Sequence, residues 1–178
     1  GDYSESKLRA EELVKASGLQ WVILRPSEVY GPDSPDAINK LIKWIQTLMV
    51  VPVIGDGRYV LSPAYIDDVI SVMSQCAFDP DMTGRILVVS GPEQMTYVEL
   101  VDRICHFLHV KRFKVFVPVV LVKALIEMMS LLGSMFLVRD QLPRLLCDKS
   151  SSLDPALKPP NYHPRKLEQG LSQCLGRL

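Results

Sequence analysis

Short runs of consecutive apolar residues alternate along this chain with segments in which apolar residues recur every three or four positions. The first pattern is typical of strands buried in a parallel sheet, and the second of helices with one face against a core. The runs predict strands at residues 21–24, 50–54, 86–89 and 114–117, and residues 59–66 predict an extended segment. Strands that alternate with helices at this spacing predict an α/β fold.

The helical pattern is clear in the first third of the chain. Residues 4–17 predict a helix that stops at Gly18, a residue that ends helices readily. A second helix follows, and its apolar residues share one face. These residues are Ile38, Leu41, Ile42, Ile45 and Leu48.

Three further helix starts are predicted from their first residues. Asp67 and Asp68 open one helix, because acidic side chains satisfy the free amide donors and favour the macrodipole there. Thr96 and Glu99 have the spacing of a capping box and predict the start of another. A short C-terminal helix is expected to carry Pro164 in its first turn.

The segment between Val119 and Val138 is almost entirely apolar. Its polar side chains are Lys123, Glu127, Ser130 and Ser134. Steps of four, three and four place them on one narrow stripe of a helix. Two charges in so short a window disfavour a membrane-spanning helix. The wide apolar arc predicts packing in the core or between subunits of a homo-oligomer, and a peripheral membrane contact stays open as an alternative.

Charge and cysteine content narrow the class of protein. Twenty basic residues balance twenty acidic ones, so nothing points to nucleic acid as a partner. The four cysteines are widely spaced and form no CxxC pair, which favours a reducing, cytoplasmic setting. His106 and His109 share a helix face near Cys105, but a tetrahedral metal site needs more ligands, and no metal is predicted.

Tyr3 and Lys7 are four residues apart in the first predicted helix, and therefore lie one above the other on the same face. A positive charge beside a phenol lowers its pKa, which makes tyrosine an acid/base near neutral pH. That is the device of a nicotinamide-dependent oxidoreductase. The spacing alone is weak, because an exposed pair in a first turn is more often a solvated face.

Further motifs follow this pair in a fixed order. They are Ile23-Leu24-Arg25-Pro26-Ser27-x-Val29-Tyr30-Gly31-Pro32, Gly55-Asp56-Gly57 and Tyr65-Ile66-Asp67-Asp68-Val69. With Tyr3-x-x-x-Lys7, they resemble the C-terminal half of the extended and atypical short-chain dehydrogenases/reductases, the NAD-dependent epimerase/dehydratase group. Residues 137–142 and 164–171 resemble the same group.

The resemblance implies the C-terminal part of a Rossmann-type NAD(P)-binding fold together with a small α/β substrate lobe. Residues 1–33 and 62–92 would belong to the nucleotide-binding domain, and residues 34–61 to the substrate lobe. Residues 93–178 would complete that lobe and supply the C-terminal helices.

The same resemblance implies roles for individual residues. Tyr3 would be the catalytic acid/base, and Lys7 would hydrogen-bond the nicotinamide ribose and lower the pKa of Tyr3. Pro26, Ser27 and Val29 would pass the nicotinamide carboxamide. The cofactor would be NAD or NADP, and the substrate a small molecule.

Two departures from the family pattern limit these expectations. The sequence has no G-x-x-G-x-x-G loop for the pyrophosphate, so the N-terminal phosphate-binding half is absent. We therefore expect a truncated sequence that is inactive alone and binds cofactor only together with that half. The second departure is Leu61, which stands where nucleotide-sugar epimerases carry a phosphate-binding arginine. Arg58 is a weaker candidate for substrate contact, since an exposed turn arginine is the simpler interpretation.

Pro63 before Tyr65 resembles the atypical branch, which includes relatives of the NAD(P)H-binding accessory subunit of respiratory complex I. Two functions are therefore expected in order of preference. The first is NAD(P)-dependent oxidoreductase or epimerase chemistry on a substrate other than a typical sugar nucleotide. The second is a non-catalytic nucleotide-binding or assembly module.

Overall fold

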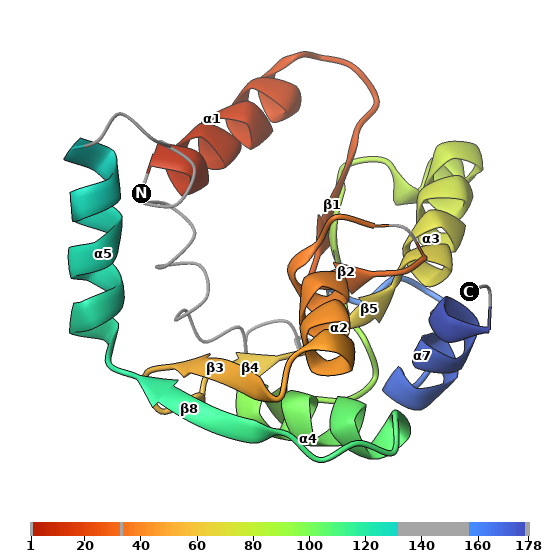
Figure 1. Ribbon diagram of the computed structural model, residues 1–178. Coiled ribbons are helices and arrows are strands. Elements are labelled where there is room, and N and C mark those ends of the chain that lie inside the picture. The colour runs from red at the N-terminus through yellow and green to blue at the C-terminus, as the bar shows by residue number, and fades with distance from the viewer. Residues whose placement is uncertain (1, 33, 132–156, 177–178) are drawn as a thin grey trace.

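The computed structural model describes residues 2–32, 34–131 and 157–176 (Figure 1). The helices are α1 (Asp2–Ala16), α2 (Ala37–Thr47), α3 (Ile66–Phe78), α4 (Tyr97–Phe107), α5 (Val119–Leu131) and α7 (Leu167–Leu175), with a short 3-10 helix at Pro80–Met82. The strands are β1 (Val22–Pro26), β2 (Val29–Tyr30), β3 (Val50–Ile54), β4 (Val60–Leu61), β5 (Ala64–Tyr65), β6 (Arg85–Val89), β7 (Met95–Thr96) and β8 (Phe113–Val117). The α/β class predicted from the sequence is confirmed.

The strands pair across long stretches of sequence. β1 lies parallel to β6, with Pro26 opposite Val89, and β2 lies parallel to β5. β3 lies parallel to β8, and the short β4 and β7 are antiparallel. The first two pairs join residues 1–33 to 62–92, and the last two join residues 34–61 to the part after 92. Their assignment to a nucleotide-binding domain and a substrate lobe stays a prediction.

Two hydrophobic clusters form the core. The larger one gathers buried side chains of α2, β3, α4 and α7, among them Ile45, Leu100 and Leu171. The smaller one lies between α3 and the strands, and includes Val69 and Val89. Because α7 contributes Leu167, Leu171 and Cys174 to the larger cluster, the end of the chain is part of the core.

The predicted face of α2 is confirmed except at its end. Ile38, Leu41, Ile42 and Ile45 are buried, whereas Leu48 is 48% exposed. The helix stops at Thr47, and Leu48 is its C-cap with extended backbone. Leu48 therefore leaves the helical register before its side chain can reach the core.

The predicted helix starts have mixed outcomes. The capping box at α4 is confirmed: the Glu99 amide donates to Thr96 Oγ1 (3.2 Å), and the Thr96 amide donates to Glu99 Oε2 (2.7 Å). The place given to Pro164 is wrong, because α7 begins at Leu167 with Lys166 as its N-cap. Gln169 Oε1 accepts from the Lys166 amide there (3.0 Å), so a polar side chain forms this start.

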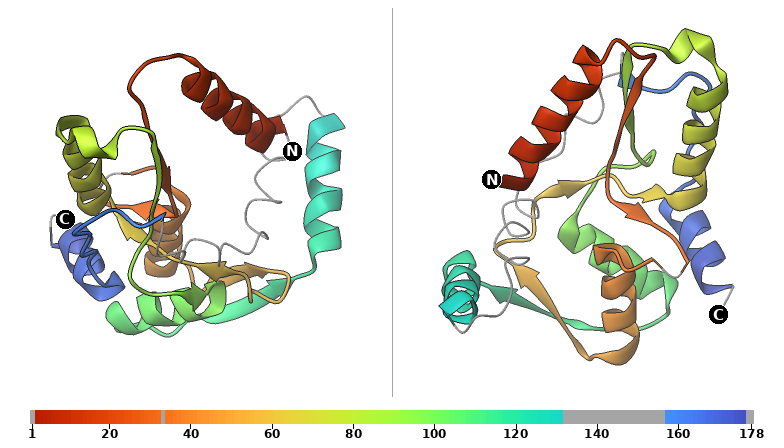
Figure 2. Two further views of the ribbon diagram at one scale, coloured as in Figure 1. Left: turned by 180° about the vertical axis from the view of Figure 1, so that it is seen from behind. Right: turned by 90° about the horizontal axis from the view of Figure 1, so that it is seen from above.

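Helices α1 and α5 stand at the margins of the molecule in every view (Figures 1 and 2). Leu13 on α1 and Val120 and Leu121 on α5 are more than half exposed. None of the helices in the described ranges is long and apolar enough to cross a membrane. The rest of the segment up to Val138, and the motif at residues 137–142, lie outside the described residues, so the packing and membrane alternatives stay predictions.

Candidate functional site

The carboxyl ends of β1 and β6 lie side by side and define one edge of a parallel pair. In open α/β sheets, ligands bind outside this edge. The loop 26–29 leads from β1 to β2. It contains Pro26, Ser27 and Val29, which are predicted to lie beside the carboxamide of the nicotinamide. The geometry of this loop is therefore the centre of the candidate site.

Backbone and side-chain hydrogen bonds hold this loop from two sides. The Ser27 amide donates to the carbonyl of Val89 (2.9 Å), and the Ser27 hydroxyl donates to the carbonyl of Ser62 (2.5 Å). The Ala64 amide donates to the carbonyl of Glu28 (2.9 Å). The loop is thereby bound to the end of β6 and to the segment between β4 and β5.

A third segment crosses at the same place. The Gly91 amide, just beyond β6, donates to the carbonyl of Ser62 (3.1 Å). A Cβ at position 91 would lie 1.9 Å from the carbonyl oxygen of Pro63, so only glycine fits. The Ser62 side chain is 1% exposed, and its hydroxyl has no hydrogen-bond partner within the described part of the chain.

Helix α1 carries the predicted acid/base pair. It spans both Tyr3 and Lys7, which confirms that they are one helical turn apart. Lys7 is exposed, and the structure does not describe the side chain of Tyr3. Whether the two residues act as a catalytic pair stays a prediction.

An ion pair that the sequence did not predict connects α1 to the end of β1. Arg25 donates from Nε to Glu11 Oε1 (2.9 Å) and from Nη2 to Glu11 Oε2 (2.6 Å). The hydrogen bond from Arg25 lowers the pKa of Glu11, and Glu11 raises the pKa of Arg25. The residues are 14 positions apart, in different elements, so no local spacing signals their contact.

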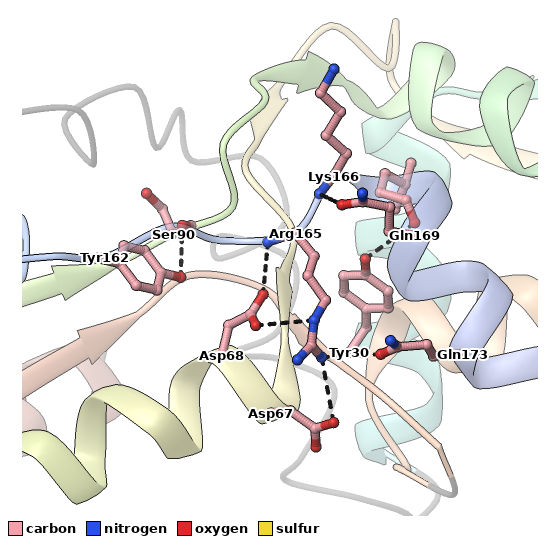
Figure 3. A network of polar contacts seen from close by, with 10 residues as sticks. Tyr30, Asp67, Asp68, Ser90, Tyr162, Arg165, Lys166, Gln169 and Gln173 are labelled. Atoms are coloured by element: carbon pink, nitrogen blue, oxygen red, sulfur yellow. Dashed lines mark hydrogen bonds and ion pairs between the residues drawn. The ribbon is translucent and has the colours of Figure 1, made fainter.

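The C-terminal segment braces the other side of the site (Figure 3). The Arg165 amide donates to Asp68 Oδ2 (2.9 Å), and its guanidinium lies 3.4 Å from oxygens of both Asp67 and Asp68. The same guanidinium lies over the ring of Tyr65, 5.0 Å from its centroid. This corrects the predicted role of the two acidic residues: they are in the first turn of α3, but their carboxylates bind Arg165 instead of capping the helix.

Two tyrosines complete this brace. The Tyr162 hydroxyl donates to the carbonyl of Ser90 (3.0 Å), at the carboxyl end of β6. Tyr30 packs edge-on against Tyr65, with ring centroids 5.5 Å apart, and its hydroxyl donates to the carbonyl of Leu167 (3.3 Å). Burial raises the pKa of both phenols, so Tyr30 and Tyr162 are protonated structural groups.

The remaining predicted positions lie in the turn after β3. Gly55 and Gly57 have positive φ and form this turn, and Arg58 is exposed beside them. Leu61 is 5% exposed and belongs to the larger hydrophobic cluster. Position 61 is thus used for packing and is not available to contact a ligand.

Other candidate sites carry less chemistry. The rings of His106 and His109 are 6.5 Å apart, and no group of three potential metal ligands occurs among the residues with a described position. A cavity of about 420 Å³ is lined by Trp21, Leu24, Met73, Cys76 and Phe78. Trp21 precedes β1, so this cavity opens at the amino end of the strand, the wrong end for ligands of an open α/β sheet.

These features define an α/β protein in which the carboxyl ends of β1 and β6 lie side by side. We name this end, with the loop 26–29, the ligand edge, because open α/β sheets bind their ligands there. The sequence model of the NAD dependent epimerase/dehydratase family matches residues 1–89, and the chain belongs to this family.

Individual proteins and solved structures are also similar to the chain. The chain is 26% identical over 114 residues to mouse NADH dehydrogenase [ubiquinone] 1 alpha subcomplex subunit 9, mitochondrial, covering 64% of this chain and 29% of that protein. Its structure is similar to UDP-glucuronic acid 4-epimerase from Bacillus cereus in complex with NAD, with 25% identity and a TM-score of 0.60 over 66% of this chain and 41% of that one.

Two other solved structures show the same fold. They are dTDP-glucose 4,6-dehydratase from Bacillus anthracis in complex with NAD, with 23% identity and a TM-score of 0.60, over 66% of this chain and 40% of that one, and Pal from Bacillus thuringiensis, with 18% identity and a TM-score of 0.66, over 97% of this chain and 51% of that one. The chain thus spans between 29% and 51% of the length of these relatives.

Proposed function

We propose that this protein carries out NAD(P)-dependent oxidoreductase or epimerase chemistry, with Tyr3 as the acid/base. The observation that supports this most directly is the arrangement at the ligand edge. A helix that carries Tyr3 and Lys7 one turn apart is joined by an ion pair to the end of β1, immediately before the loop 26–29. Membership in the NAD dependent epimerase/dehydratase family supports the same chemistry.

In this proposal Tyr3 gives or takes the proton of a substrate hydroxyl or carbonyl. Lys7 favours the phenolate through its positive charge and hydrogen-bonds the ribose of the cofactor. NAD(P), when bound, supplies the hydride acceptor or donor. The role of Lys7 requires that it stay charged in the site.

The loop 26–29 fits the nicotinamide end of such a cofactor. Its backbone is fixed by the bonds of Ser27 and Glu28 and so presents a constant surface. Because the Ser27 hydroxyl already donates to Ser62, its oxygen is left as an acceptor, which suits the amide hydrogens of a carboxamide. Pro26 and Val29 would supply apolar contact on either side.

The pyrophosphate end has no matching element in this sequence, because no G-x-x-G-x-x-G loop is present. We propose that polypeptide beyond these 178 residues supplies it. The lengths of the relatives are consistent with this. Titration calorimetry of the 178-residue chain with NADH is then expected to show no appreciable binding, and saturable binding would contradict this part of the proposal.

The substrate proposed is a small alcohol or carbonyl compound other than a typical sugar nucleotide. The supporting observation is Leu61, whose burial leaves no charged group at that position for a diphosphate. Arg58 is exposed in the adjacent turn and is the proposed contact for an anionic group of the substrate. Arg58→Ala is expected to raise KM and leave kcat unchanged.

Tyr3→Phe in the complete gene product tests the catalytic proposal. It is expected to abolish hydride transfer between deuterium-labelled NAD(P)H and a carbonyl panel, while cofactor binding is retained. Tyr59→Phe, a buried change away from the loop 26–29, is the control and is expected to keep turnover. Full turnover by Tyr3→Phe would refute the proposal.

An assembly role is the weaker alternative. The match to the mouse complex I subunit is 26% over 114 residues and covers 29% of that protein, which does not favour assembly over catalysis. Co-purification with a membrane complex, together with no hydride transfer by the wild-type protein, would reverse this preference.

A further inference from the structure

The contact between Glu11 and Arg25 has the geometry of an orienting device. The guanidinium presents two parallel N–H groups to the two carboxylate oxygens, at 2.9 and 2.6 Å. A planar bidentate pair constrains direction as well as distance, which a single point contact does not. Since α1 and β1 each supply one partner, the pair constrains the helix relative to the strand.

The position of Glu11 on α1 gives this constraint a consequence. Lys7 and Tyr3 lie four and eight residues before Glu11. Four residues of an α-helix make one full turn and about 40° more. Tyr3, Lys7 and Glu11 therefore lie within an arc of about 80° on one face of α1. The face that binds Arg25 is therefore the face that carries the proposed acid/base pair.

Arg25 is equally well placed on its own element. It is the next-to-last residue of β1 and directly precedes Pro26 and Ser27 of the loop. Glu11 is consequently held at the carboxyl end of the strand.

Hydrophobic burial does not set this rotation within the described residues. Leu8, Leu13 and Val14 on α1 are 56%, 73% and 42% exposed. A helix whose apolar side chains are exposed gains little from any one rotation about its axis. The pair of Glu11 and Arg25 is a contact among the described residues that favours one rotation of α1 over others.

We propose that Glu11 and Arg25 are positioning residues, which fix the rotation of α1 so that Tyr3 and Lys7 face the loop 26–29. The inference rests on the proposed function for its catalytic meaning. The rotation itself is a property of the chain without ligand, and it can be measured whether or not the protein is an enzyme.

Residual dipolar couplings of backbone amides in the 178-residue chain measure this rotation. In the wild type, the α1 couplings fit one orientation relative to β1, β6 and α3. In Glu11→Gln and Arg25→Lys we expect the α1 couplings to shrink or to fit a new orientation, while those of β1 and β6 keep their values. The exchange Glu11→Arg with Arg25→Glu is expected to restore part of the wild-type pattern.

The chain offers a matched control on the same helix. Glu5 and Arg9 form an ion pair of 2.6 Å that stays within α1. Glu5→Gln removes the same chemical group, and is expected to leave the α1 couplings unchanged. Unchanged couplings in Glu11→Gln, or an equal effect of Glu5→Gln, would overturn the proposal.

Kinetics of the complete gene product form the second arm. Glu11→Gln is expected to lower kcat by about tenfold or more, because misplacement of Tyr3 acts on the reacting geometry. The KM for NAD(P)H is expected to rise as well, because Lys7, which binds the ribose in the proposed function, turns together with Tyr3. If the wild-type protein shows no turnover, the proposed function is wrong. The residual dipolar couplings then still decide whether Glu11 and Arg25 fix the rotation of α1. A wild type with turnover and an unchanged kcat in Glu11→Gln defeats the positioning alone.

Discussion

Gly91 lies against the carbonyl oxygen of Pro63 so closely that a Cβ at position 91 would be 1.9 Å from it. The contacted atom is backbone, and cannot move aside as a flexible side chain can. Gly91→Ala is therefore expected to destabilise the chain by about 3 kcal/mol or more. Chemical denaturation followed by circular dichroism measures this loss.

Gly18→Ala is the control for this substitution. Gly18 has a positive φ of 72°, but a Cβ there would meet no atom within 4 Å. Its cost is the backbone strain of a left-handed residue, about 1–2 kcal/mol. A smaller loss for Gly91→Ala than for Gly18→Ala would show that the segments at the ligand edge do not cross as described.

Ser27 and Ser62 are expected to respond differently to the same change. Ser27→Ala removes the hydroxyl that donates to the Ser62 carbonyl and is expected to cost about 1 kcal/mol. Ser62→Ala removes a buried hydroxyl that has no partner in the described part of the chain, so stability is expected to be unchanged or slightly higher. Equal losses in the free energies of unfolding of the two variants would contradict this.

Stability is expected to fall at acidic pH partly through Glu93. Its carboxylate accepts from Arg103 (2.8 Å) and from the Leu167 amide (3.2 Å), and these bonds, chiefly that from Arg103, lower its pKa. A lowered pKa in the folded state stabilises the fold above the ordinary value of 4.5, and this contribution is lost as the pH falls through the lower value.

Glu93→Gln tests this pH dependence. At pH 7 the variant is expected to be less stable by roughly 0.5–1 kcal/mol, because the pair is partly exposed. The difference should shrink toward zero as the pH falls below about 4. Glu12→Gln, which removes an exposed carboxyl from α1, is the control for the substitution itself. A difference that stays constant with pH would exclude Glu93 as a source of acid sensitivity.

The buried and half-buried tyrosines are expected to resist ionisation. Burial raises the pKa of Tyr97 to about 12, and it also raises the pKa of Tyr30, Tyr59 and Tyr162. A raised pKa stabilises the fold fully below the ordinary value of 10.0, and this contribution is lost as the pH rises further. Tyrosinate absorbance should therefore rise together with unfolding at alkaline pH, and separate titration of these tyrosines in the folded chain would contradict it.

Local signals predicted local structure well. Strand β3 has the bounds expected from its apolar run, and the capping box of α4 forms between the two residues that predicted it. Leu48 and Pro164 were misplaced because the helix ends depend on one or two residues that periodicity does not resolve.

The parts of the site that the sequence did not predict all join distant residues. Asp68 is an acidic residue of the kind expected in the first turn of a helix. No residue near it in the sequence indicates that its partner is Arg165. Glu11 and Arg25 are likewise ordinary surface charges until the fold brings α1 beside the end of β1. The family motifs supplied the candidate residues, whereas the contacts that hold them required the structure.

The bond between Arg165 and Asp68 also bears on how the chain is made. The two residues are 97 positions apart, so the whole segment between them must leave the ribosome before Asp68 meets its partner. Until then the start of α3 has two uncompensated carboxylates, and the larger core lacks the side chains of α7. Closing so long a loop is slow compared with forming the helices themselves. Residues 157–176 therefore join the fold late, and a premature stop codon before them would leave a nascent chain open to proteolysis.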